Sequence, residues 1–342
     1  MRKLLNTLYV TRQDSYLAKD GEALCVRAEK KTLLRLPLIG LEGVVCFGVV
    51  NASPALLHAC AESDITVSFL SENGRYLASV RGPTSGNVLL RREQFRRADS
   101  SEARTALARF MVHGKLVNTR AVLRRALRDH EHELDAEALH GAILGINSAL
   151  DHADAAADDE ILRGVEGDAA RIYFGVFDQL VLRREEFPFN GRNRRPPRDA
   201  VNCLLSFLYT LLLHDVRSAL ETVGLDPQVG YLHRDRPGRP SLALDMMEEL
   251  RPWLADRMAL TLINRRNVKP TDFKTDGAGG VTLADDARKE VLTAWQKRKQ
   301  EEVQHPFLEE RIPIGLVPYT QAMLLARHLR GELDGYPPFI WR

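Results

Sequence analysis

The sequence predicts an α+β protein in which a small N-terminal antiparallel β domain is followed by a larger all-α domain. The first eighty or so residues are typical of short strands, beginning with residues 7–11, which alternate polar and apolar side chains with a period of two. A cluster of turn-forming residues, Gly-Pro-Thr-Ser-Gly-Asn at 82–87, comes next. Beyond it, apolar residues recur at steps of three and four. A chain of 342 residues favours about two domains, and we place them at residues 1–85 and 86–342.

Short strands separated by turn residues make up the predicted β domain. Lys19-Asp20-Gly21-Glu22 is typical of a hairpin turn, and a second turn is expected at 72–75. One helix interrupts the strands, because Ser53 suits an N-cap and Pro54 suits the first helical position of a helix that ends near Glu62. The expected strands span residues 7–11, 16–18, 23–27, 32–37, 43–48, 65–70 and 76–80.

The predicted helical domain opens with an apolar stripe at helical spacing in residues 107–118. Residues 204–213 form the longest apolar stretch, which is roughly half of what a bilayer requires. We therefore expect a buried helix there. Ser241 is expected to cap a further helix, and loops are expected at 187–197 and 230–240.

The composition is that of a soluble globular protein, with 44% hydrophobic and 27% charged residues. The first residues lack a long apolar run, so we expect no secretory signal, no membrane segment and a cytoplasmic location. The cysteines show no Cys-x-x-Cys spacing, which argues against a zinc ribbon or a disulfide scaffold. We expect them to be buried in a reducing cytoplasm. They are Cys25, Cys46, Cys60 and Cys203.

Three acidic residues are candidates for chemistry. Glu166 lies between Gly164 and Gly167, which leave room for a ligand, although alone it is typical of a solvated glutamate near a helix start. Asp245 and Glu248 are three residues apart, so on a helix they project from neighbouring positions. Acids in a first helical turn are also favoured by the helix dipole. Apolar residues flank this pair, however, and an unpaired carboxylate near a buried surface is costly, a cost that a bound metal would offset.

Taken in order, these stretches resemble the Cas1 family, the integrase and endonuclease of CRISPR adaptation. The matching segments are Gly-x-Glu-Gly-x-Ala-Ala around Glu166, Gly-Tyr-Leu-His ending at His233, and Ser-Leu-Ala-Leu-Asp-Met-Met-Glu ending at Glu248. The resemblance implies that Glu166, His233 and Glu248 hold a catalytic metal and that Asp245 supports them. Many relatives carry aspartate where Glu248 stands, which leaves open whether Glu248 or Asp245 binds directly. The Arg-Pro-Pro-Arg and His-Arg-Asp-Arg stretches point to the type I-C branch.

The resemblance also implies a reaction and partners. The helical domain would insert foreign DNA fragments as new spacers into a repeat array, with the 3′ hydroxyl of the fragment as nucleophile, or water in the nuclease reaction. Carboxylate ligands favour Mg²⁺ or Mn²⁺, which neutralises charge on the phosphoryl oxygens, and an imidazole tilts the site toward Mn²⁺. The expected partners are double-stranded DNA, a second copy joined largely through residues 1–85, and the small Cas2 protein.

Arginines gather in clusters, although the net charge of the chain is only +2. Each cluster alone is typical of a charged face. Arginine heavily outnumbers lysine in them, which suits bidentate contact with phosphate, and several flank the proposed ligands. The residues that we expect to bind DNA are Arg194, Arg195, Arg198, Arg234, Arg236, Arg239 and Arg265.

Two other functions fit parts of this pattern. A non-catalytic DNA-binding scaffold would use the same arginines, and a metal hydrolase of a small substrate would use the same acids. Metal-dependent cleavage and salt-sensitive DNA binding would distinguish them. The ligand-rich stretch 128–135 is not expected to bind metal, because His130 and His132 would point to different sides of a helix. With nearby acids such as Asp158 and Asp159, it is typical of a solvated acidic surface.

Overall fold

The computed structural model describes residues 7–29, 31–41, 43–71, 76–82, 88–130 and 132–341, which fall into two compact units. The first unit comprises Met1–Gly86, Arg288–Glu301 and Pro313–Leu316, and the second comprises Asn87–Ala287, Glu302–Ile312 and Val317–Arg342. The two later segments of the first unit were not part of the division predicted from the sequence. A β region followed by a mostly helical region confirms the predicted order of the fold.

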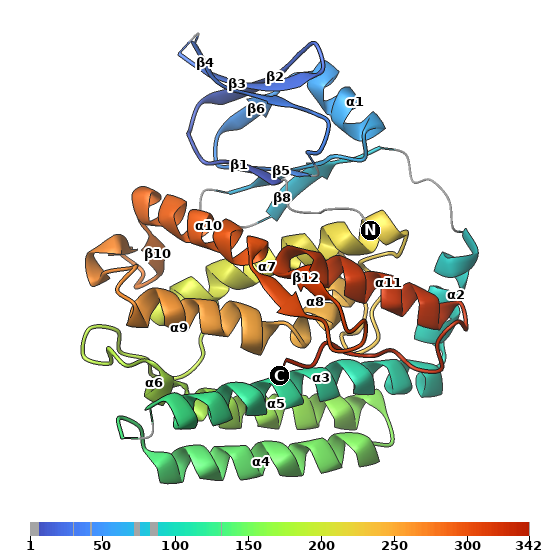
Figure 1. Cartoon of the computed structure of the whole chain (residues 1–342), viewed down its shortest axis with the longest axis vertical. Helices are drawn as coiled ribbons and strands as arrows, with labels where there is room; N and C mark the ends of the chain where they lie inside the picture. Colours follow the sequence, from blue (N-terminus) through green and yellow to red (C-terminus); the bar gives the residue numbers. More distant parts are fainter. Residues whose placement is uncertain are drawn as a thin grey trace. The chain divides into compact units, whose positions relative to one another are not determined.

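Two four-stranded sheets form the first unit (Figure 1). Their orders are β1(Thr7–Val10)-β5(Gly43–Phe47)-β7(Thr66–Leu70)-β8(Tyr76–Val80) and β4(Lys31–Pro37)-β3(Ala23–Ala28)-β2(Ser15–Asp20)-β6(Val50–Ala52). The β1–β5, β5–β7 and β2–β6 pairs are parallel, and the others are antiparallel. The antiparallel prediction is therefore wrong in part. Turn residues reveal hairpins between neighbours in sequence, but they do not show how strands far apart in the chain pair.

The first unit is held by a buried core between its sheets and helix α1 (Pro54–Glu62). Ser53 caps α1 as predicted, since its hydroxyl accepts a hydrogen bond from the Leu56 amide at 3.2 Å. The four cysteines are free and buried, as predicted. Burial raises the pKa of Cys46 to about 12 and that of Cys60 to about 11, so these thiols are unreactive. The predicted turn at 72–75 lies outside the described residues, as does most of the 82–87 linker.

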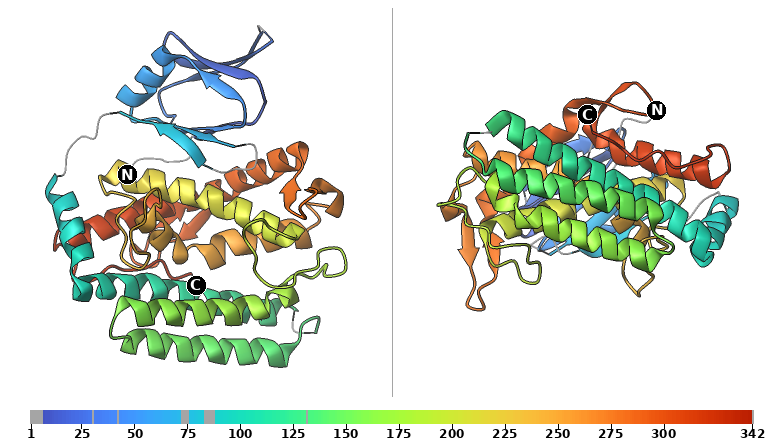
Figure 2. Two further views of the ribbon diagram at one scale, coloured as in Figure 1. Left: turned by 180° about the vertical axis from the view of Figure 1, so that it is seen from behind. Right: turned by 90° about the horizontal axis from the view of Figure 1, so that it is seen from below.

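Long helices dominate the second unit, and the view from below shows α3, α4 and α5 packed side by side (Figure 2). The helices are α2 (Val88–Asp99), α3 (Ser101–His130), α4 (Ala136–Ala155), α5 (Asp159–Gly175), α6 (Phe177–Leu180), α7 (Ala200–Val223), α8 (Ser241–Glu248), a π-helical turn (Arg251–Asp256), α9 (Arg257–Asn264) and α11 (Val317–Leu329). Helix α10 (Asp285–Gln300) belongs to the first unit from Arg288 onward.

The prediction of an all-α second domain is wrong in detail, because two small ribbons interrupt the helices. Strands β9 (Phe273–Thr275) and β10 (Val281–Leu283) form one, and β11 (Glu302–Gln304) and β12 (Arg311–Pro313) form the other. Each strand has three residues. A segment of that length is too short to show the alternation by which strands are recognised in a sequence.

Helix α7 contains the apolar stretch 204–213, which is buried as predicted. It begins after Asp199, whose side chain accepts a hydrogen bond from the Asn202 amide at 2.7 Å, and it ends at Gly224 with a φ of 91°. By length and composition α7 is able to cross a membrane, but 56% of its most apolar window is buried within the protein. This is the behaviour of a core helix.

The predicted cap of α8 is corrected by the structure. Pro240 occupies the N-cap position, and Ser241 is the first helical residue. The Ser241 hydroxyl donates a hydrogen bond to the carbonyl of Arg234 at 3.3 Å. It therefore holds the preceding loop instead of the helix end.

The C-terminal segment is tied to α3 and α8 by Asn118 and Glu249, both fully buried. The Asn118 amide group donates to the carbonyls of Glu249 (2.7 Å) and Phe339 (2.8 Å), and its oxygen accepts from the Trp341 amide (2.8 Å). Helix α3 lies so close to these two segments that a Cβ on Gly114 would lie 2.8 Å from Pro338 and 3.0 Å from Glu249. These contacts place the end of α8 directly against the middle of α3.

Replacing Asn118 by alanine should therefore loosen this junction. Three buried hydrogen bonds are lost and two carbonyls and an amide are left unpaired, which should cost about 3 kcal/mol of unfolding free energy. Chemical denaturation measures the loss, and hydrogen exchange should show faster exchange at Trp341. Leu144→Ala on the exposed face of α4 is the control. An Asn118→Ala protein as stable as this control would contradict the assignment.

Candidate functional site

Three helices bring two predicted acids to one lysine. The ammonium group of Lys115, from α3, contacts the carboxylate of Glu166, from α5, and lies 2.6 Å from Oε2 of Glu248, at the end of α8. Oε1 of Glu248 pairs with Arg251 at 2.7 Å. The Glu248 side chain is only 2% exposed, so it lies in the interior between two cations.

Local structure explains why these groups meet. The chain passes from α8 directly into a π-helical turn, which returns Arg251 to Glu248. The guanidinium of Arg251 rests over the Tyr209 ring, 5.0 Å from its centroid. Gly164 and Gly167 flank Glu166 in the middle of α5, and a Cβ on either would meet nothing within 4 Å. The space predicted around Glu166 is therefore present.

The charges of this cluster depend on one another. Burial alone would raise the pKa of Glu248, but Arg251 and Lys115 outweigh it and lower the pKa to about 2. Burial likewise favours neutral Lys115, yet Glu248 and Glu166 raise its pKa overall. Oε2 of Glu248 makes no properly directed hydrogen bond, although it lies beside Lys115. Lys115 is thus the group that compensates this oxygen in the structure.

Asp245 organises the loop that carries His233. Its Oδ2 accepts hydrogen bonds from the amides of Tyr231 (2.6 Å) and Leu232 (2.9 Å), and its Oδ1 accepts from the amide of His233 (2.9 Å). Oδ1 also lies 2.6 Å from Nδ1 of His233. A Cβ on Gly230 would lie 2.8 Å from Oδ2, so only glycine allows the loop to approach this closely.

These contacts bear on the question that the sequence left open between Asp245 and Glu248. Asp245 is fully buried, and its two carboxylate oxygens face four nitrogens of the loop: three backbone amides and Nδ1 of His233. Because a carboxylate only accepts, Nδ1 of His233 is the donor in this pair, and in the neutral imidazole the lone pair then lies on Nε2. Asp245 is thus arranged to orient His233, whereas Glu248 presents an oxygen toward Glu166.

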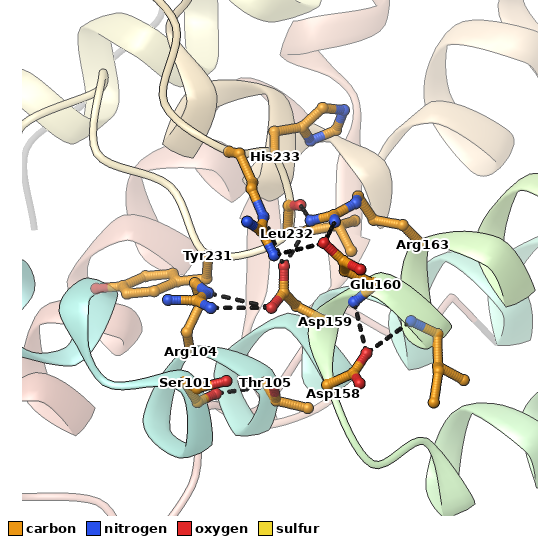
Figure 3. Close-up of polar contacts among 12 residues, drawn as sticks. Ser101, Arg104, Thr105, Asp158, Asp159, Glu160, Arg163, Tyr231, Leu232 and His233 are labelled. Carbon is orange, nitrogen blue, oxygen red and sulfur yellow. Dashed lines mark hydrogen bonds and ion pairs between the residues drawn. The ribbon is translucent and has the colours of Figure 1, made fainter.

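A second set of ion pairs holds the same loop to the start of α5 (Figure 3). Asp159, 1% exposed, pairs with Arg104 (3.0 Å), Arg163 (2.5 Å) and Arg234 (3.4 Å). Arg163 also donates to the carbonyl of Leu232 at 3.2 Å. The prediction of a solvated acidic surface is wrong for Asp159, because two of its partners, Arg104 and Arg234, come from distant parts of the chain and Asp159 is buried among them. The neighbouring acid, Asp158, caps α5.

In the structure, Glu166 and Glu248 thus both contact the ammonium group of Lys115, and Asp245 holds the ring of His233. In the part of the chain that the structure describes, no three His, Cys, Asp or Glu side chains converge as they stand to form a metal cluster. The ammonium of Lys115 lies between the two glutamates instead.

The sequence interpretation missed Lys115 and Arg251. Lys115 lies four residues after the buried Met111 and next to Gly114, within a predicted apolar stripe. Lysine is rarely buried without a partner, so its position there was an available signal. Arg251 follows Glu248 by three residues, a spacing that permits an ion pair on a helix.

The predicted DNA-binding arginines lie in different surroundings. Arg194 lines a small cavity together with Lys115 and Arg251, so it belongs to the candidate site. Arg234 is partly neutralised, because it pairs with Asp159 and with Glu160 (2.9 Å). Burial and the charge of a neighbouring arginine lower the pKa of Arg239. Arg195, Arg198, Arg236 and Arg265 are exposed.

Comparison with known proteins places this arrangement in a family. The family model for the CRISPR associated protein Cas1 matches residues 8–297. The chain belongs to the Cas1 family. This confirms the resemblance drawn from the motifs around Glu166, His233 and Glu248, while assignment to the type I-C branch stays a prediction.

Relatives within the Cas1 family match the whole chain. A CRISPR-associated endonuclease Cas1 from Chlorobaculum tepidum is 52% identical over 343 residues, and one from Rhodospirillum rubrum is 55% identical over 347 residues. Both alignments cover 100% of each protein. Among solved structures, a chain of a Cas6-RT-Cas1–Cas2 complex is 25% identical with a TM-score of 0.82, and the match covers 100% of this chain and 36% of that one.

Asp245→Asn should disturb the His233 loop of this Cas1-family chain. The new amide group would face backbone amides that need an acceptor, so we expect a loss of about 2 kcal/mol of stability. Amide hydrogen exchange at residues 231–233 should accelerate. Asp235→Asn, on the exposed part of the same loop, is the matched control. Unchanged exchange in Asp245→Asn would show that the carboxylate does not hold the loop.

Proposed function

We propose that this Cas1-family chain is a metal-dependent DNA endonuclease and integrase of CRISPR adaptation. The observation that carries the proposal is the convergence of Glu166 and Glu248 on one cationic group, with His233, whose Nδ1 is held by Asp245, close enough to influence the charge of Glu248. Two carboxylates share a mostly buried position only where positive charge compensates them. The names of the two relatives, which match along their whole length, support an endonuclease.

The donor set fits Mg²⁺ or Mn²⁺. Glu166 and Glu248 would supply carboxylate oxygens, and His233 would supply Nε2, a combination that favours Mn²⁺ without excluding Mg²⁺. The poorly directed contact at Oε2 of Glu248 supports this fit. When bound, the ion would supply positive charge to the phosphoryl oxygens and to the departing 3′ oxygen.

The residues of this chain would then perform three tasks. Asp245 holds His233 in the tautomer that presents Nε2. Arg251 keeps Glu248 ionised, and Arg194, at the edge of the adjoining cavity, would contact a phosphate. No side chain is assigned as nucleophile. In strand transfer, the oxygen of a DNA 3′ hydroxyl would form the new bond to phosphorus. The bond from phosphorus to the old 3′ oxygen would break, and that oxygen would take up a proton. In cleavage, water would take the place of the hydroxyl.

We also propose that the chain works as a homodimer joined through residues 1–85, in complex with Cas2 on double-stranded DNA in the cytoplasm. The solved relative in a Cas1–Cas2 complex supports the Cas2 partner. Insertion of a fragment into a repeat array requires two DNA molecules at once. Exposed arginines on separate loops, such as Arg198 and Arg236, suit that demand.

Glu166→Ala, His233→Ala and Glu248→Ala should each reduce metal-dependent DNA cleavage and strand transfer by at least 100-fold, because each removes one of few ligands. Excess chelator should abolish the activity of the unaltered protein. Asp168→Ala, an exposed acid on α5, should have little effect. If the unaltered protein binds DNA but never cleaves or joins it with any metal, the non-catalytic scaffold is the better description.

Lys115→Met should raise the affinity of the site for Mn²⁺ about tenfold or more, because it removes a cation that competes for Glu166 and Glu248. The metal-free variant should melt at a lower temperature, since two carboxylates then lack compensation. Electron paramagnetic resonance of free Mn²⁺ and thermal melting measure the two effects. If the variant binds Mn²⁺ more weakly, Lys115 favours metal binding and does not compete with the ion.

A DNA fragment blocked at its 3′ hydroxyl should bind to the protein and Cas2 but fail to join a supercoiled plasmid that carries the repeat. Only the nucleophile is missing in this fragment, so its dissociation constant should stay within about twofold of that of the free fragment. Gel analysis of joined products provides the measurement. Equal joining of blocked and free fragments would rule out the 3′ hydroxyl as nucleophile.

A further inference from the structure

Helix α3 carries a stripe of arginines away from the candidate metal centre. Arg120, Arg124 and Arg128 recur every four residues, so they lie along one face of the helix. This face borders a groove of about 410 Å³. Figure 1 shows the C-terminal segment beside α3, and Trp341 contributes the groove's aromatic wall. The full lining is Val117, Arg120, Ala121, Arg124, Arg125, Arg128 and Trp341.

Described side chains compensate only part of the positive charge of this arginine groove. Asp129 pairs with both Arg125 (3.1 Å) and Arg128 (3.2 Å). Arg120 is held by the neutral amide of Asn147 at 2.8 Å, and Arg124 makes no hydrogen bond or ion pair with any described residue. Burial and the like charge of Arg124 lower the pKa of Arg120. Among the residues that the structure describes, four guanidinium groups therefore face the groove and one carboxylate, that of Asp129, pairs with two of them.

Trp341 holds arginines in place without neutralising them. Its ring lies 5.4 Å from the guanidinium carbon of Arg125 and 4.1 Å from that of Arg257. Such cation–π contacts hold a guanidinium in place without adding a negative charge beside it. The backbone of Trp341 is fixed in turn by its hydrogen bond to Asn118. The groove is thus preorganised, which reduces the entropy lost when it binds a ligand.

The arginine groove lies on a different side of α3 from Lys115. A helix turns by about 100° per residue, so Arg120 and Arg124 are rotated by roughly 140° and 180° from Lys115. A ligand in the groove would therefore not be the phosphate that reacts beside Glu166 and Glu248.

We propose that this groove binds the phosphate backbone of duplex DNA without reading its sequence. From Arg120 to Arg128 the helix rises about 12 Å, a length that spans roughly three to four phosphates of one strand. The fork of a guanidinium matches a phosphate group. The inference relies on the proposed function only for the identity of DNA as ligand, since the contact itself lies outside the metal centre.

The test is a double charge reversal, Arg124→Glu with Arg128→Glu, in the full chain. Fluorescence anisotropy of a labelled 30-base-pair duplex should give a dissociation constant at least tenfold higher than that of the unaltered protein. The slope of log K against log salt should become shallower by about two units, one per lost phosphate contact. Arg124→Lys with Arg128→Lys should retain most of the binding. Arg311→Glu with Arg330→Glu, exposed elsewhere on the helical unit, is the matched control.

Mn²⁺ binding by the reversed protein separates this inference from the proposed metal centre. The affinity for Mn²⁺ and the melting temperature should both be unchanged, because the groove lies on another side of α3. An unchanged dissociation constant and salt slope would overturn the inference, and so would an equal loss in the control. Normal DNA binding together with a failure to bind Cas2 would overturn it as well, because the groove would then serve a protein partner.

Discussion

The compensation of charge around buried Glu248 is the constraint on which the helical unit depends. A carboxylate that is 2% exposed must have cations nearby, and Lys115 and Arg251 supply them from α3 and from the π-helical turn. These ion pairs favour the observed packing, in which α3 lies against the end of α8. Gly114 permits this approach, since a side chain there would collide with Glu249. The cluster that compensates Glu248 is thus also the one where we propose that a metal ion replaces the ammonium of Lys115.

The loop that carries His233 likewise depends on a buried carboxylate, that of Asp245. Asp245 serves the fold by capping three backbone amides, and it serves chemistry by fixing the tautomer of His233. Asp159 anchors the loop from the other side through Arg163 and Arg234. Because both anchors are buried carboxylates with several donors, the loop is rigid before any ligand arrives. Preorganisation of this kind lowers the cost of binding an ion or a phosphate.

Local signals in the sequence were sufficient for some features and not for others. Ser53 could be recognised as an N-cap because a cap depends on the few residues that follow it. The parallel pairing of β1 with β5 could not, because three strands of the other sheet lie between them in the sequence. The metal-site candidates came from motifs, which name residues but not their neighbours. Lys115, which belongs to none of these motifs, was therefore missed. Asp159 was predicted to lie on the surface, because the sequence does not show that it pairs with arginines in the interior.

The central claim is that Glu166, His233 and Glu248 hold one divalent ion in the place that the Lys115 ammonium now takes. Anomalous diffraction from a crystal soaked in Mn²⁺ tests it most directly, because it locates the ion and the lysine together. We predict a single strong peak bounded by the two carboxylates and Nε2 of His233, with Lys115 turned away from both glutamates. A saturated crystal with no peak there, or with Lys115 still bridging Glu166 and Glu248, would contradict the claim.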